Sequence, residues 1–164
     1  MSDPVSRARE FARLGRVEWR PKYGRYGEAE LPKKPLILIV DDDDAMRNAT
    51  KRLMRAVGFR AEAFGTAEDL LKSDRVHRAA CIIADMQMPK MSGLEMHRRL
   101  VGSGTAIPTI LITAYPEDSV RTRALEAGII CYLTKPFSKN DLLACIHSAL
   151  DRGAAGPNPE DNAG

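Results

Sequence analysis

Five short apolar runs are spread along the chain, and a longer, more polar stretch follows each of them. The runs are rich in Ile, Leu and Val, and their length and branching favour buried strands over helices. The second run alternates apolar and charged residues, which is typical of a half-exposed strand at the edge of a sheet. The predicted strands cover residues 36–40, 59–64, 81–85, 107–113 and 129–133.

The stretches between the runs carry the signals of helices. Ser92 and Glu95 have the spacing of a capping box, and Ser138 precedes another helix start. Gly58 and Gly128 mark two helix ends. The predicted helices cover about residues 44–57, 66–72, 92–100, 117–127 and 138–150. Strand and helix thus alternate five times, which predicts an α/β fold: a doubly wound parallel sheet with five strands, helices on both faces and right-handed crossovers.

Charge and composition divide the chain into three parts. Residues 1–34 form a basic arm with aromatic residues, and residues 1–35 hold nine Lys and Arg against five Asp and Glu. The rest of the chain holds sixteen against seventeen. The low apolar content of the arm favours a flexible segment over a short amphipathic helix. The folded domain is predicted at 35–150, and the Gly- and Pro-rich residues 151–164 are expected to be a disordered tail.

Cysteine usage and hydropathy indicate the compartment. The three cysteines include no C-x-x-C pair, which argues against a disulfide framework and against a zinc site. No apolar run approaches the length of a membrane span, and the N-terminus lacks a signal-peptide apolar region. We therefore expect a cytoplasmic protein that does not bind membranes.

Polar groups stand at the ends of four predicted strands. Asp41 and Asp42 follow the first strand, Asp85 ends the third, Thr113 ends the fourth, and Lys135 follows the fifth. Since the carboxyl ends of parallel strands share one sheet edge, these groups are expected to converge there. Asp85 is then a nucleophile, a metal ligand or both; the alternative is a loop residue that caps backbone amides.

Phosphoryl transfer is the chemistry that suits these groups, because it needs mainly positioning and charge neutralisation. Asp85 is the expected attacking carboxylate, forming an acyl phosphate. The run of four aspartates at 41–44 must be offset by a cation or by the start of the next helix. Mg2+ prefers oxygen ligands and is expected on Asp42 and Asp85, with Asp41 acting through a water. Lys135 and Thr113 would contact phosphoryl oxygens.

Four segments carry a family resemblance: VDDDDAMR (40–47), DMQMPKMSGLE (85–95), ITA (112–114) and YLTKPF (132–137). In this order and spacing they resemble the receiver domain of bacterial two-component response regulators, most closely the FixJ/NarL type, over about residues 35–150. The resemblance implies the strand order 2-1-3-4-5, which the chemotaxis receiver exemplifies.

The resemblance also implies roles for single residues. Asp85 is the implied phosphoacceptor, and Asp41 and Asp42 are the acidic pair. The backbone carbonyl of Gln87 is the implied third protein ligand of Mg2+. Further implied features are a switch pair of Thr113 and Tyr132, the lysine role of Lys135, and a cis peptide bond between Lys135 and Pro136. Cys131 departs from the residue usual before the switch aromatic, which bears on packing.

Partners follow from the resemblance as well. A histidine kinase is the implied phosphoryl donor. No output domain is recognised after residue 150, so we expect a stand-alone receiver that catalyses only its own phosphorylation and dephosphorylation. Its output would be partner binding or transfer to a histidine phosphotransfer protein. A homodimer is an option, through the face formed by the helix at 117–127, the strand at 129–133 and the helix at 138–150.

Two other functions are each compatible with part of the sequence. A haloacid-dehalogenase-type phosphatase would use Asp41 as nucleophile and Asp43 as acid, with Thr113 and Lys135 in support. Ala45 stands where that family usually has Thr or Val, and the Asp85 segment would be unexplained. A regulator that contacts DNA through its basic arm is the other alternative, but DNA binding is unlikely because no recognition helix is apparent.

Overall fold

A parallel sheet of five strands lies at the centre of the structure, in the order β2-β1-β3-β4-β5. The computed structural model describes residues 34–155, so the predicted arm up to residue 33 and residues 156–164 lie outside the described residues. The fold class and strand order expected from the sequence are confirmed. The strands are β1 (Leu36–Val40), β2 (Arg60–Phe64), β3 (Cys81–Asp85), β4 (Thr109–Thr113) and β5 (Cys131–Thr134).

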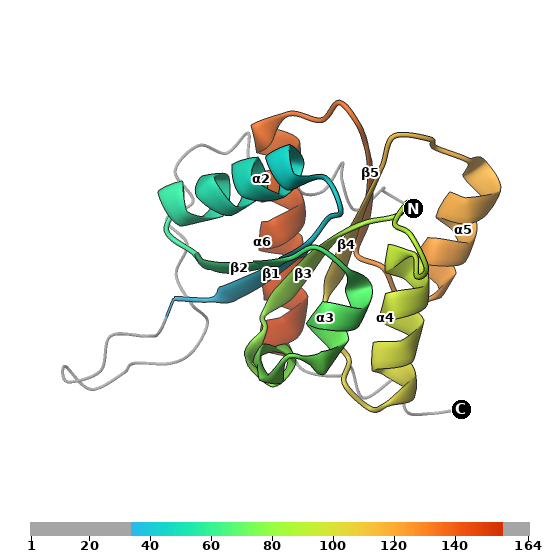
Figure 1. Cartoon of the computed structure of the whole chain (residues 1–164), viewed down its shortest axis with the longest axis horizontal. Coiled ribbons are helices and arrows are strands. Elements are labelled where there is room, and N and C mark those ends of the chain that lie inside the picture. Colours follow the sequence, from blue (N-terminus) through green and yellow to red (C-terminus); the bar gives the residue numbers. More distant parts are fainter. Residues whose placement is uncertain (1–33, 156–164) are drawn as a thin grey trace.

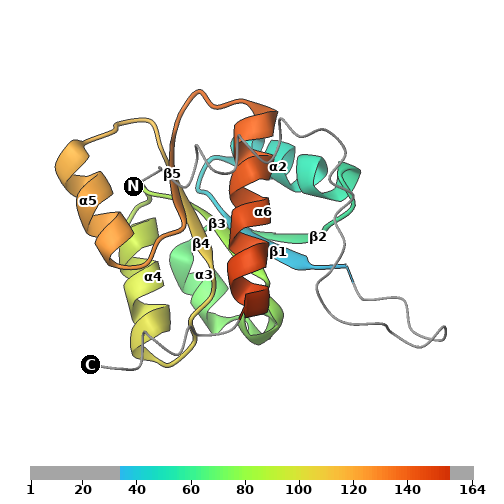
Figure 2. The same ribbon diagram turned by 180° about the vertical axis from the view of Figure 1, so that it is seen from behind.

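Helices cover both faces of the sheet (Figures 1 and 2). One face carries the first and last helices, and the other carries the three between them. A 3-10 turn, η1 (Asp74–Arg78), which the sequence pattern did not predict, leads into β3. The helices are α2 (Asp44–Ala56) and α6 (Lys139–Ala155) on one face, and α3 (Ala67–Lys72), α4 (Gly93–Gly102) and α5 (Asp118–Glu126) on the other.

The central strands β1, β3 and β4 are mostly apolar, which fits their burial on both faces. In β1, Leu38 and Val40 belong to the layer under α3, α4 and α5, whereas Ile37 and Ile39 belong to the layer under α2 and α6. Each fully buried Leu or Ile side chain contributes about 1.5–3 kcal/mol. The edge position predicted for β2 is confirmed, since it pairs only with β1. Packing in these two apolar layers holds each strand in place, and with it the residues at the end of the strand.

The helix starts follow the predicted capping, with one difference. Ser138 accepts a hydrogen bond from the Asp141 N–H at 3.0 Å. Ser92 accepts one from the Glu95 N–H at 3.1 Å. The reciprocal half of the predicted capping box is not formed, because the Glu95 carboxylate pairs with Arg99 at 3.2 Å, one helical turn further on. That (i, i+4) ion pair competes for the same oxygen atoms.

The last helix is longer than predicted. It continues to Ala155, so residues 151–155 are helical and do not belong to a tail that begins at 151. Asp151, Arg152 and two alanines are compatible with a helix, and the single Gly153 costs only about 1 kcal/mol. Gly156 and Pro157 follow in the sequence, and this pair is a stronger helix-ending signal than Gly153.

The three cysteines are all buried between the sheet and α6. Cys81 lies on β3, Cys131 on β5 and Cys145 on α6, and all three are free thiols. Burial raises the pKa of the Cys81 thiol far above its usual value. All three thus pack as small apolar residues of the core. Within residues 34–155, no helix has the length and apolar character needed to cross a bilayer.

Candidate functional site

Three carboxylates meet at the carboxyl-end edge of the sheet. Asp41 and Asp42 follow β1, Asp85 ends β3, and one carboxylate oxygen from each lies within 4.8 Å of the others. They meet because β1 and β3 are neighbours in parallel register, with Val40 opposite Ala84. Asp41 and Asp85 are 7 % and 8 % exposed, whereas Asp42 is open to solvent. The donor set is all oxygen and strongly acidic, which suits a hard divalent cation.

The environment of Asp41 disfavours its charged form. Burial is the largest cause, and the negative charge of Asp85 adds to it, so the pKa of Asp41 rises to about 6. The Asp43 N–H, which donates to Asp41 Oδ1 at 2.9 Å, and the Lys135 ammonium both oppose this rise. A bound cation would relieve the same repulsion, because it favours the ionised carboxylates.

Lys135 brings an ammonium group to Asp85. Its Nζ lies 3.2 Å from Asp85 Oδ2, although Asp85 ends β3 and Lys135 follows β5, on the other side of β4. The Lys135 N–H donates to the Thr113 carbonyl at 2.8 Å, which ties the start of the last loop to β4. The peptide bond between Lys135 and Pro136 is cis. The predicted convergence of strand ends therefore holds for the acidic residues and for the lysine.

Thr113 ends β4 with its side chain fully buried. Its hydroxyl oxygen lies 2.7 Å from Gln87 Nε2 and 2.9 Å from Gln87 Oε1, and it accepts a hydrogen bond from the Tyr115 N–H at 3.0 Å. The Gln87 N–H in turn donates to Asp85 Oδ1 at 3.0 Å. Sequence reasoning gave Gln87 only a backbone role and missed this side-chain contact. The pairing of Asp85 with Ile112, which brings residue 87 beside residue 113, would have been needed to find it.

Tyr132 occupies an inward position. The ring is 6 % exposed and belongs to the apolar layer under α3, α4 and α5. Its hydroxyl has no hydrogen-bond partner among residues 34–155. The ring therefore already lies inward in this structure. Leaving a buried hydroxyl unsatisfied costs about 1–3 kcal/mol, so an outward position is energetically accessible.

Arg47 is a second cation at the site, and sequence reasoning missed its role. Its Nη1 donates to the Asp41 carbonyl oxygen at 2.8 Å, and its Nη2 pairs with the Asp44 carboxylate. The four aspartates had been expected to need a cation or a helix N-terminus to offset them. The Arg47 guanidinium, in the first turn of α2, provides part of this positive charge. The (i, i+3) spacing of Asp44 and Arg47 was the available signal.

Gly93 sets how closely α4 approaches β3. A Cβ atom at this position would lie 2.6 Å from the Asp85 carbonyl oxygen and 2.8 Å from Leu111 Cδ2. Only glycine lets the helix begin directly against the strand end. The loop between Asp85 and α4 contains one non-glycine residue at positive φ, Lys90, at 68°. This arrangement brings the helix start to the backbone that carries Asp85.

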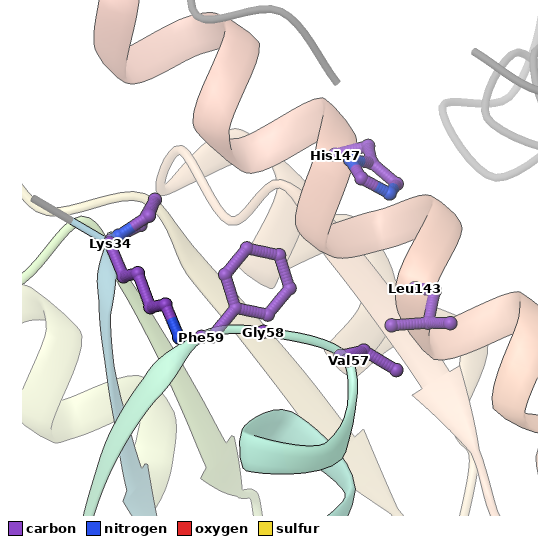
Figure 3. A pocket seen from close by; sticks show the side chains of 7 residues that line it. Lys34, Val57, Gly58, Phe59, Leu143 and His147 are labelled. Carbon is purple, nitrogen blue, oxygen red and sulfur yellow. The ribbon is translucent and has the colours of Figure 1, made fainter. Parts of the chain in front are cut away.

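A pocket of about 190 Å³ lies at the opposite, amino-end edge of the sheet (Figure 3). It lies between the end of α2 and the outer side of α6, where Phe59, Leu143 and His147 surround it. Lys34 stands at its rim, directly before β1. Its lining includes no carboxylate and none of the predicted site residues. The pocket is therefore separate from the acidic cluster.

Comparison with known proteins identifies the family. Residues 37–147 match the response regulator receiver domain family. Nodulation protein W of Bradyrhizobium diazoefficiens is 33 % identical over 138 residues, covering 84 % of this chain and 60 % of that protein. Response regulator protein TmoT of Ectopseudomonas mendocina is 37 % identical over 131 residues, covering 80 % and 58 %. The structure of FixJ-N matches with a TM-score of 0.68 and 28 % identity, covering 73 % of this chain and 96 % of that one.

The chain therefore belongs to the response regulator receiver family, as its motifs implied. Receiver domains are phosphoacceptor signalling domains that typically bind Mg2+ at an acidic pocket, and this chain holds an acidic cluster at the carboxyl-end edge of its sheet. The chain spans about 60 % of the length of the curated relatives it matches first. The match therefore concerns the receiver domain of those proteins and not their remaining residues.

Proposed function

We propose that Asp85 is the residue that accepts the phosphoryl group. The observation that carries this proposal is the contact of its carboxylate with both kinds of group that the reaction needs. Lys135 pairs with one oxygen at 3.2 Å, and the Asp41 and Asp42 carboxylates lie within 4.8 Å. An Asp85 oxygen attacks phosphorus, the bond to the donor's leaving group breaks, and an acyl phosphate forms. Lys135 then neutralises charge on the transferred group.

Asp42 and Asp85 would hold Mg2+ directly, the Gln87 carbonyl would be a third ligand, and Asp41 would act through a water. The all-oxygen donor set and the crowding of three carboxylates support this assignment. When bound, Mg2+ supplies charge neutralisation for the carboxylates and the phosphoryl oxygens. The chain's own contribution is to hold the Asp42 and Asp85 carboxylates close together and to bring the Lys135 ammonium to Asp85.

Thr113 and Tyr132 form the proposed switch. In the unphosphorylated chain the Thr113 hydroxyl lies against the Gln87 amide. A phosphoryl oxygen on Asp85 would compete for that hydroxyl and draw the loop that begins at Ala114 toward Asp85. The buried Tyr132 ring, packed on the same side of the sheet, would have its inward position favoured. Moving a population from 1:99 to 99:1 takes about 5.5 kcal/mol of differential stabilisation.

The proposed phosphoryl donor is a histidine kinase. Output would run through the face formed by α5, β5 and α6, which Tyr132 adjoins, by binding a partner, a histidine phosphotransfer protein or a second copy of the chain. In this role the chain catalyses only its own phosphorylation and dephosphorylation. The phosphatase alternative, with Asp41 as nucleophile, is less favoured because it gives Asp85 no role. The DNA-contacting alternative rests on the arm, which lies outside the described residues.

The test is phosphorylation of the full chain by acetyl phosphate with Mg2+ present. We expect the wild-type chain to incorporate one acid-labile, hydroxylamine-sensitive phosphoryl group and Asp85→Asn to incorporate none, because the nucleophile is gone. Intact-mass spectrometry before and after hydroxylamine measures this. Labelling retained in Asp85→Asn and lost in Asp41→Asn would instead support the phosphatase mechanism.

A further inference from the structure

Arg47 touches the backbone of the acidic turn and leaves the proposed metal-binding carboxylates free. Its guanidinium makes two contacts of different kinds, one with the Asp41 carbonyl oxygen at 2.8 Å and one with the Asp44 carboxylate. The Arg47 side chain is only 20 % exposed, whereas Asp44 is 84 % exposed. A solvated surface ion pair would not need a guanidinium that is largely buried. The buried contact, to the carbonyl, is the informative one.

The Asp41 carbonyl controls the direction of the next side chain. That carbonyl and the Asp42 N–H belong to one planar peptide unit, so fixing the oxygen fixes the plane. The plane sets where the Asp42 Cα lies and which way its carboxylate can point. Asp42 is exposed and follows the end of β1, so the sheet does not hold it directly. The guanidinium therefore orients a carboxylate that it does not touch.

Asp41 is anchored from three sides. Its N–H donates to the Phe64 carbonyl at 3.2 Å, its Oδ1 accepts from the Asp43 N–H at 2.9 Å, and its carbonyl accepts from Arg47. The guanidinium also lies beside Gly65, the residue after β2. A Cβ atom there would lie 3.4 Å from Arg47 Nη1. Arg47 thus joins the loop after β1 to the loop after β2, beside the acidic cluster.

We infer that Arg47 is a positioning residue for the proposed divalent-cation pocket: its guanidinium orients the Asp41–Asp42 peptide so that the Asp42 carboxylate meets that of Asp85. This inference rests on the proposed function and deepens it. Electrostatics alone would predict that removal of Arg47 strengthens Mg2+ binding, because a positive charge beside a cation site should weaken cation binding. Positioning predicts the reverse, that removal of Arg47 weakens binding. The two effects are therefore separable by the direction of the change.

The experiment is calorimetric titration of the full chain with MgCl2, on three variants and the wild type. Arg47→Gln removes both the charge and the planar guanidinium with its two donor nitrogens. Arg47→Lys keeps the charge but loses that planar two-donor geometry. Arg52→Gln removes a charge from an exposed position on the same helix and is the matched control. We expect both Arg47 variants to raise the Mg2+ dissociation constant about 10- to 100-fold, the usual size for residues that orient metal ligands. The Arg52 variant should bind like the wild type.

Urea unfolding without metal distinguishes positioning from a general structural role. If Arg47 only supports the helix start, its variants lose stability and keep their Mg2+ affinity, which overturns the inference. Tighter binding by Arg47→Gln overturns it as well, since charge alone would then explain the result. Absence of Mg2+ binding by the wild-type chain has a different meaning, because it overturns the proposed metal site and this inference with it.

Discussion

Polar groups have different surroundings at the amino-end edge and at the carboxyl-end edge of the sheet. At the amino-end edge, His97 lies 3.2 Å from the Thr109 hydroxyl and 3.0 Å from the Ala127 carbonyl, and the Thr109 hydroxyl donates to Ile107 at 2.9 Å. Every polar group in that chain of contacts has a partner. At the carboxyl-end edge, three carboxylates crowd together with Lys135 as their only cation in direct contact among the described residues.

The difference separates a structural polar network from a functional one. Buried polar groups that satisfy one another specify packing and need no ligand. Groups of like charge that are buried together store repulsion, which a cation or a phosphoryl group can change. Both edges lie on the same apolar strands, so the chemistry belongs to the strand ends and not to the sheet. The following predictions test this contrast.

The largest effect is expected from Gly93→Ala at the carboxyl-end edge. The new Cβ would meet the Asp85 carbonyl oxygen at 2.6 Å, so α4 must move away from β3. We expect a loss of about 3 kcal/mol in the free energy of unfolding, measured by urea denaturation. Gly102→Ala, near the other end of α4 with nothing within 4 Å, is the control. It should be neutral or stabilising by up to about 1 kcal/mol, and equal losses in both variants would contradict the close approach.

A smaller loss is expected from His97→Leu at the amino-end edge. This change leaves the Ala127 carbonyl and the Thr109 hydroxyl buried with fewer partners. The free energy of unfolding should fall by about 2 kcal/mol. Phosphorylation of Asp85 should be kept, because His97 is remote from the acidic cluster. His147→Leu, at an exposed position of α6, should leave stability unchanged and serves as the control.

Asp42→Asn should stabilise the metal-free chain, in contrast to the two substitutions above. Removing one of three carboxylates within 4.8 Å of one another relieves repulsion. The metal-free chain should gain about 1 kcal/mol of stability. The same change should reduce the shift in melting temperature that MgCl2 produces. Thermal melts with and without MgCl2 measure both, and an unchanged shift would remove Asp42 from the metal site.

The smallest effect is a pH dependence from His97. Burial lowers the pKa of this imidazole, partly offset by its hydrogen bond to the Ala127 carbonyl. The neutral form is therefore favoured in the folded chain, and the unfolded chain binds more protons below about pH 6.5. This contribution to stability is present above pH 6.5 and is lost as the pH falls through the lowered pKa.

The measurement is the difference in unfolding free energy between wild type and His97→Gln at pH 7.5 and pH 5.5. Other groups titrate in both proteins and cancel in the comparison. We expect the advantage of the wild type to shrink at the lower pH. An advantage that grows on acidification would mean that the folded chain prefers the charged imidazole.

The carboxyl ends of the strands were predictable because the sequence changes from apolar to polar residues where each buried strand ends. Asp85, Thr113 and Lys135 each stand at such a boundary, and parallel strands bring those boundaries to one edge. The strand order was not predictable from the runs themselves, and it came from the family resemblance. β5 begins two residues later than predicted, at Cys131, although Ile129 and Ile130 are buried and the Ile130 N–H donates to the Thr109 carbonyl.

The contact of Arg47 with the Asp41 carbonyl and that of Gln87 with Thr113 could not be predicted, for a common reason. Both side chains are long, and both reach a partner whose position depends on strand register or on the path of a loop. Gln87 reaches Thr113, 26 residues along the chain. Arg47 reaches a backbone carbonyl, which has no sequence signature. Tyr132 differs again, because an aromatic residue at a strand end is compatible with either an inward or an outward ring.

The buried thiols have a practical consequence for spectroscopy. All three cysteines of the chain are enclosed, and burial raises the pKa of Cys81, so thiolate, the reactive form, is scarce at neutral pH. A maleimide dye should therefore leave the native chain unlabelled. Tyr115 is 71 % exposed, and its N–H contacts the Thr113 hydroxyl. A single reporter cysteine introduced by Tyr115→Cys would carry a fluorophore on that loop without replacing any native cysteine.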